Sequence, residues 1–235
     1  MRARWLMLPL ALASLSWASE ACAQQSLFNV PAGEIARPGR LFAQLQVTAS
    51  PDAGEGSLTV DLGVTPFFEV GCNVNHVPLY GGGGDGGPAP SAVTGNAFFV
   101  VSPTSWLRLS LGGQVGSAWR PSLGRADFVA EGWLLARALL VDERLRLVAG
   151  AYVGTESALG AGDPAGAVLG AEFEVVHHRL ALMADWVVGR NPSGVAVAGV
   201  VVTLPGDVLF SAGAQLPSPG TDNDFGAVFE LTYGG

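Results

Sequence analysis

Charged side chains recur at alternate positions within short apolar segments of this chain, so each segment carries its charges on one face. Successive side chains of a β-strand point to opposite faces, and the polar face of a closed sheet would form its interior. Carboxylates and guanidinium groups gathered there form either ion pairs that fill the interior or the selective lining of a narrow pore. The expected lining residues are Asp61, Glu69, Arg108, Glu131, Arg137, Arg146, Glu172, Glu174, Asp185 and Glu230.

The acidic members of this set outnumber the basic ones, which favours cations over anions in any passage that they line. Arg137, Arg146, Glu172, Glu174 and Asp185 fall on consecutive segments and are therefore expected side by side in a meander. Both outcomes, an ion-pair plug and a narrow cation-favouring passage, stay open at this point.

The three histidines offer little for catalysis. His177 and His178 fall in a short turn, where solvated turn residues are expected. His76 has the parity of the apolar outer face near a long loop, a suitable place for chemistry on lipids. Neither a serine at a fixed spacing nor an orienting acid can be assigned to it, so we expect that the chain is not an enzyme.

No motif predicts a cofactor or a metal ion. The segment 160–166 lacks the spacing of a phosphate-binding loop and contains Pro164. The glycine-rich segment 81–87 occurs once, without the repeats that calcium-binding glycine motifs need. Once the leader described below is removed, Cys72 is the only cysteine, which excludes an intramolecular disulfide and a metal site made of thiolates.

The N-terminus has the pattern of a secretory signal peptide over residues 1–23, with arginines, an apolar stretch and a small-x-small site that predicts cleavage after Ala23. Lipidation at Cys22 is disfavoured because the charged Glu20 lies just before it. Residues 24–39 are predicted as a periplasmic N-terminal segment, either a lead or a piece folded into the mouth of a barrel.

The predicted mature chain is acidic. Twelve basic and twenty acidic residues become ten and nineteen when residues 1–23 are removed, which gives a net charge of −9. Binding to nucleic acid needs clustered lysine and arginine, and the remaining arginines are scattered. We expect no nucleic-acid partner.

Eleven turn-like breaks divide the rest of the chain into twelve short segments, which predicts twelve strands over residues 40–233. Long breaks are expected at 50–56, 78–91, 116–125, 155–164, 190–194 and 217–223, and short ones at 65–66, 102–105, 141–143, 177–178 and 204–206. Every second connection of an up-and-down barrel lies on the same rim, so the long and short breaks are sorted onto opposite rims. The sequence predicts an all-β fold, an up-and-down antiparallel transmembrane β-barrel.

Strand length and aromatic placement favour a membrane barrel over a soluble one. Strands of about 10 residues just span the hydrocarbon layer when tilted. Aromatic residues also lie near segment ends, as in the interfacial girdles of such barrels. They include Phe67, Phe68, Phe98, Phe99, Trp106, Trp119, Phe128, Trp186, Phe210, Phe225 and Tyr233.

The last segment, with Phe229, Leu231 and Tyr233 at alternate positions, resembles the C-terminal strand of bacterial outer-membrane proteins, although two glycines follow the final aromatic. The stretch 26–31 resembles the opening of an uncharacterised subgroup of these barrels. The resemblance implies the outer membrane of a Gram-negative-type bacterium after signal-peptide cleavage, with periplasmic chaperones and the barrel-insertion machinery as partners during biogenesis.

The predicted function is a narrow porin or channel for small solutes, with outer-membrane lipid around it and small solutes or ions inside. The alternative is a closed structural or adhesive barrel that acts through its extracellular loops, chiefly 78–91 and 116–125. A soluble, lipocalin-like barrel is a third alternative. The pattern specifies neither a solute nor an oligomeric state.

Overall fold

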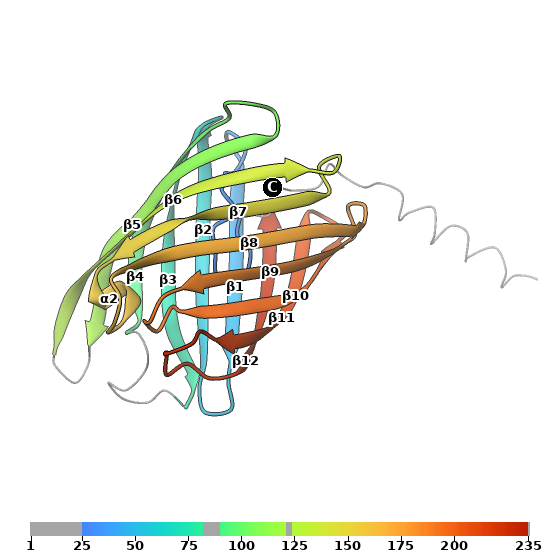
Figure 1. Ribbon diagram of the computed structural model, residues 1–235. Helices are drawn as coiled ribbons and strands as arrows, with labels where there is room; N and C mark the ends of the chain where they lie inside the picture. The colour runs from blue at the N-terminus through green and yellow to red at the C-terminus, as the bar shows by residue number, and fades with distance from the viewer. Residues whose placement is uncertain (1–24, 82–89, 121–123, 235) are drawn as a thin grey trace, which may run out of the picture.

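The computed structural model describes residues 25–81, 90–120 and 124–234 and shows an all-β closed barrel of twelve antiparallel strands (Figure 1). Each strand pairs with the next along the chain, and β1 closes the barrel against β12. This confirms the predicted up-and-down topology and its twelve strands. No helix among these residues is long and apolar enough to cross a membrane.

The strands are 9 to 16 residues long and are joined by connections on alternate rims of the barrel. They are β1 Leu41–Ala49, β2 Gly54–Thr65, β3 Phe68–Tyr80, β4 Ala92–Val101, β5 Leu107–Arg120, β6 Arg125–Leu140, β7 Leu145–Gly154, β8 Ala165–Val176, β9 Leu180–Val188, β10 Val195–Leu204, β11 Val208–Pro217 and β12 Gly226–Gly234. One short helix, α2 Glu156–Leu159, lies in the connection between β7 and β8.

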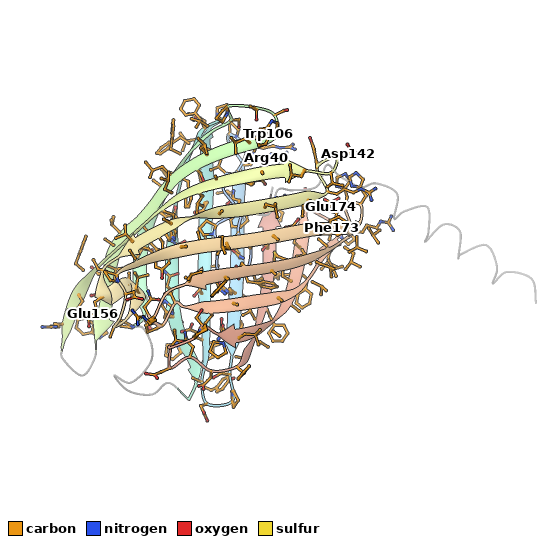
Figure 2. All side chains as sticks on the ribbon, in the orientation of Figure 1. Arg40, Trp106, Asp142, Glu156, Phe173 and Glu174 are labelled. Carbon is orange, nitrogen blue, oxygen red and sulfur yellow. The ribbon has the colours of Figure 1, made fainter. Side chains whose placement is uncertain are left out.

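The barrel has two distinct rims. The start of β1 and the connections at 66–67, 102–106, 141–144, 177–179 and 205–207 form what we call the short-turn rim, and the described residues of the other connections form the long-loop rim. Figure 2 shows Asp142 and Glu174 at one end of the barrel and Glu156 at the opposite end.

Two predicted long breaks are shorter than expected. The first is a tight turn, with the Ser50 amide donating to the Ala53 carbonyl, and β2 begins at Gly54. The second, predicted at 116–125, begins later than expected because β5 continues to Arg120, and β6 begins at Arg125. A Cβ on Gly116 would collide with the Val93 carbonyl oxygen, so the glycine permits close approach of β4 and β5 and does not form a turn.

The apolar face of each strand points outward. Leucine, valine and aromatic side chains of every strand are exposed on the outside of the barrel, including Leu45, Leu111, Leu134 and Phe229. The outside of a soluble barrel would be polar, whereas an outer-membrane barrel presents an apolar band to lipid. The free Cys72 is also exposed, between the outward-facing Val70 and Val74 of β3.

Residues 25–39 occupy the lumen and are called the plug below. The plug forms a tight loop in which the Leu27 amide donates to the Val30 carbonyl, and it then leads along the wall into β1. Leu27, Phe28 and Val30 are almost completely buried against inward-facing side chains of β7 to β12. Burial of each such side chain stabilises the fold by about 1.5–3 kcal/mol. Sequence analysis gave two alternatives for this segment, a periplasmic lead or a piece folded into the barrel mouth. In the structure it lies deeper in the barrel than the mouth.

Replacing an outward-facing leucine with arginine tests whether this face meets lipid. Leu134, near the middle of β6, is 62% exposed, and Leu134→Arg is expected to cost roughly 2–4 kcal/mol because a charge at the membrane midplane is poorly solvated. The measurement is the free energy of unfolding in urea of protein refolded into lipid vesicles. Phe225→Arg, equally exposed but at the rim, is the control and should cost about 0–1 kcal/mol. Equal costs at both depths would contradict a lipid-facing band.

Candidate functional site

A cavity of about 260 Å³ lies between the plug and the wall formed by β1 to β6. At one end it is lined by Phe42, Asp61 and Glu69, which lie near the short-turn rim. At the other end it reaches Ser157 and Ser193 in the connections of the long-loop rim. The cavity therefore extends along most of the height of this wall.

The cavity is acidic. Four carboxylates line it, from Glu34 of the plug, Asp61 of β2, Glu69 of β3 and Glu131 of β6. None of the described residues that line it is an arginine or a lysine. The lining therefore favours cations at Asp61, Glu69 and Glu131, whereas the charge of Glu34 is shared with Arg137, which contacts its carboxylate.

A row of amide side chains joins two of these carboxylates across the wall. Asn96 donates to Asp61 (2.9 Å) and to Asn73 (3.1 Å). Asn73 donates to Gln114 (3.0 Å), which in turn donates to Glu131 (2.9 Å). Because each amide donates to the next group of the row, both carboxylates accept a hydrogen bond at the cavity wall. This polar row was not identified from the sequence, although its members occupy inward positions on β2 to β6.

The His76 ring points into the cavity, so the sequence prediction that it faces outward was wrong. Asn75 and His76 together oppose Ser57, which makes His76 the extra residue of a β-bulge, with φ of 55°. The bulge reverses the side-chain parity at that point. His76 Nδ1 lies 3.0 Å from Glu55 Oε2, so the orienting acid that sequence analysis could not assign is Glu55 of the adjacent strand.

Phe98 also lies inside the barrel, stacked on Trp133 with ring centroids 5.8 Å apart. It was expected among the outer aromatics. Phe98 and Phe99 are neighbours on one strand and must point to opposite faces, and Phe99 is the exposed member.

The plug is held by carboxylates of the wall. Asp185 of β9 accepts hydrogen bonds from the backbone amides of Asn29 and Val30, and Glu69 accepts from the Ala36 amide and the Gln25 side chain. Charge-assisted hydrogen bonds of this kind are about twice as strong as neutral ones. Two predicted lining residues, Asp185 and Glu69, therefore bind the chain's own N-terminal segment.

The glycines of the inner wall make space for the plug. A Cβ on Gly170 would collide with Leu27, and one on Gly213 would lie 2.7 Å from the Phe28 ring. The space that a larger residue would take at these two positions is therefore filled by plug side chains.

The three predicted basic lining residues lie away from the cavity, towards the short-turn rim. Arg137 is 1% exposed and its guanidinium contacts the Glu34 carboxylate, and Arg108 lies 3.7 Å from the same carboxylate. Arg146 and Glu172 form an ion pair at 3.0 Å. This region is a set of ion pairs that includes Glu34 of the cavity, whereas Asp61, Glu69 and Glu131 form no ion pair with an arginine of the described residues.

The two remaining predicted lining residues differ in their surroundings. Glu230 is buried and accepts a hydrogen bond from Gln44 (2.8 Å). Glu174 lies at the short-turn rim, where its carboxylate contacts His177 and His178. Inward-facing residues of β7 to β12 are otherwise mostly apolar, so the lumen is polar on one side and hydrophobic on the other.

No family model matches the sequence, and no curated protein does either. Among solved structures the chain is similar to LpxR from Salmonella typhimurium, with a TM-score of 0.46 and 10% identity over 82% of this chain and 99% of that one. It is also similar to the outer membrane channel DcaP of Acinetobacter baumannii, with a TM-score of 0.33 and 12% identity over 82% and 71% of the two chains. The likeness is one of barrel architecture, that of outer-membrane barrels.

This comparison contradicts the expectation that the chain is not an enzyme. LpxR, named above, is an outer-membrane enzyme. The match at 10% identity assigns no reaction and no residue roles.

The contact between Glu34 and Arg137 is expected to anchor the plug. Glu34→Gln leaves the Arg137 guanidinium buried without its carboxylate, which should lower the free energy of unfolding by about 3–5 kcal/mol. Arg137→Met is the reciprocal change, and the double variant should recover part of the loss. Urea unfolding of the four proteins measures this. Costs that simply add would show that the two side chains do not interact.

Proposed function

We propose that this chain is an outer-membrane protein that forms a narrow, cation-favouring passage for small solutes, closed in this conformation by the plug. In this proposal the short-turn rim is periplasmic, the long-loop rim is extracellular, and residues 1–23, outside the described residues, are cleaved on export. The observation that carries the proposal is the acidic cavity, which extends from Asp61 and Glu69 to Ser157 and Ser193 beside the plug.

The charge of the cavity supports cations as the favoured solutes. Glu34, Asp61, Glu69 and Glu131 line one continuous space, while the arginines nearest to them are paired with Glu34 or Glu172 towards the short-turn rim. Rings of acidic side chains in a low-dielectric wall attract cations and repel anions.

The position of the plug supports a closed resting state. Its C-terminal part packs on the inner face of β2, where a Cβ on Gly63 would collide with the carbonyls of Ala36 and Arg37. The Gly39 amide donates to the Gly63 carbonyl at the same level (2.8 Å). The cavity therefore ends against the plug near the short-turn rim, and conduction requires the plug to move.

A closed structural or adhesive barrel is the second candidate function. It is favoured by the hydrophobic side of the lumen, where Leu27, Phe28 and Val30 complete a packed core with Met183, Val197 and their neighbours. A core of this kind stabilises a barrel that never opens. Conductance separates the two candidates.

A disulfide between the plug and the wall tests whether plug movement opens the passage. Ser110 Oγ lies 3.1 Å from the position of a Cβ on Gly33, close to the separation of about 3 Å between a Cβ and the far sulfur of a disulfide. Gly33 has a φ of 69°, where a side chain is strained, so Gly33→Cys alone serves as the control for folding. Gly33→Cys/Ser110→Cys is made with Cys72→Ser, which removes the native thiol. In planar bilayers the oxidised protein should be silent, and reduction should restore the openings of the Cys72→Ser parent.

The outcomes decide between the candidates. Conduction that is the same before and after reduction would show that the plug does not gate the passage. Silence of the parent, the reduced and the oxidised protein over repeated insertions would support the closed barrel. The single variant Ser110→Cys is the matched control and should respond to neither oxidant nor reductant.

Neutralising an acidic residue of the cavity should lower cation selectivity. A unit negative charge about 7 Å away in a water-like medium stabilises a cation by about 0.6 kcal/mol and destabilises an anion by the same amount, a difference of about 1.2 kcal/mol or about sevenfold in relative permeability. Glu131→Gln should therefore reduce the permeability ratio of potassium to chloride by up to about sevenfold, measured from the reversal potential in a salt gradient. Glu143→Gln removes the same charge from the 141–144 turn and should leave the ratio unchanged. An unchanged ratio for Glu131→Gln would argue against this cavity as the ion path.

A further inference from the structure

A second cluster of polar side chains lies at the short-turn rim, outside the cavity. It consists of Glu174, near the end of β8, and of His177 and His178 in the turn that leads to β9. His177 Nδ1 lies 2.7 Å from Glu174 Oε2, and His178 Nδ1 lies 3.8 Å from Glu174 Oε1. One potential ligand atom from each of the three residues lies within 4.8 Å of the others.

The local backbone explains why both imidazoles are on the same side. The pairing of β8 with β9 shifts register between Glu174 and Val176, and the Arg179 amide closes the turn on the Val176 carbonyl. His178 has a φ of 54°, a left-handed conformation that is uncommon for a residue other than glycine. As a result the two rings lie with their centroids 3.6 Å apart instead of pointing to opposite faces as neighbours in a strand do.

The donor set and its spacing are those of a transition-metal site. Two imidazoles and one carboxylate bind Zn²⁺ at about 2.0–2.2 Å, and tetrahedral ligands at that distance are about 3.3 Å apart. The separations of 2.7 and 3.8 Å, which run to the two different oxygens of Glu174, lie on either side of this value, and one ligand atom from each residue lies within 4.8 Å of the others. His178 Nδ1 is buried and has no hydrogen-bond partner within the described part of the chain, so a ligand atom is available.

We propose that Glu174, His177 and His178 bind a divalent first-row transition-metal ion at the short-turn rim. The ion is coordinated by the two imidazoles and the carboxylate, and water completes its coordination. Imidazole ligands suit zinc, copper, nickel and iron, whereas magnesium and calcium take oxygen ligands, which defines the selectivity of the site. Because all three ligands belong to one strand end and its turn, the bound ion stabilises that turn of the folded barrel.

The test uses the full mature chain, refolded in detergent and purified without a histidine tag. Titration with Zn²⁺ in a calorimeter should show one ion per chain, and titration with Mg²⁺ should show no binding. Co²⁺ serves as a spectroscopic probe and should give the visible absorption bands of a low-coordinate site with nitrogen and oxygen ligands. No Zn²⁺ binding, or Mg²⁺ binding with equal affinity, would overturn the proposal. The Co²⁺ spectrum needs no variant, so it tests the site even if a substitution prevents folding.

Substitutions identify the ligands. Asparagine tolerates the left-handed backbone, so His178→Asn should leave the turn intact. Loss of a residue that only hydrogen-bonds to a metal ligand weakens metal binding by roughly 10- to 100-fold, and loss of the ligand itself in His178→Asn should weaken Zn²⁺ binding at least as much. His177→Asn and Glu174→Gln should do the same. His76→Asn examines the other pair of histidine and carboxylate in the chain. Loss of binding in His76→Asn, with binding retained in the turn variants, would place the ion at Glu55 and His76 and overturn the assignment. Heat-modifiable migration on gels verifies that each variant is folded.

Discussion

The closed ring of backbone hydrogen bonds is the constraint on which the rest of this structure depends. A strand edge has no hydrogen-bond partner in hydrocarbon, so the sheet must close, and β1 pairs with β12 over eight residue pairs to do so. Closure fixes which side chains face lipid and which face inward. The carboxylates, amides and guanidinium groups of the strands are then confined to the lumen, where they must be paired, hydrated or bound to another part of the chain.

The inward-facing side chains find their partners in different ways on the two sides of the lumen. On the β7 to β12 side the inward residues are largely apolar, and the plug supplies Leu27, Phe28 and Val30 to complete a hydrophobic core. On the β1 to β6 side they are amides and carboxylates, and a cavity remains. Asp185 and Glu69 hold the plug between these regions. The plug is therefore both part of the core and one wall of the cavity, so its movement would change both.

The fold could be predicted from the sequence because period-two alternation is a local property. Leu58, Val60 and Leu62 alternate with polar residues, and the same holds along most strands, so the number of strands and the outward apolar face follow. The site could be predicted only in part. The bulge at His76 adds one residue to β3 and so reverses which face of the strand the His76 side chain points to. Gly116 is a residue type common in turns, but here it allows close packing of two strands. The plug pairs residues more than 150 positions apart, such as Val30 and Asp185, and no local pattern contains that information.

Accessibility of single cysteines to thiol reagents tests the central claim, an acidic lumen enclosed by a lipid-facing wall, most directly. Ser57 lines the cavity on β2, and Leu58 is the next residue and faces outward. Ser57→Cys and Leu58→Cys would be made in a Cys72→Ser background and exposed, in intact outer membranes, to membrane-impermeant cationic and anionic methanethiosulfonates. The account predicts that the cationic reagent modifies Ser57→Cys faster than the anionic one, and that neither modifies Leu58→Cys. Modification of Leu58→Cys with protection of Ser57→Cys would contradict it.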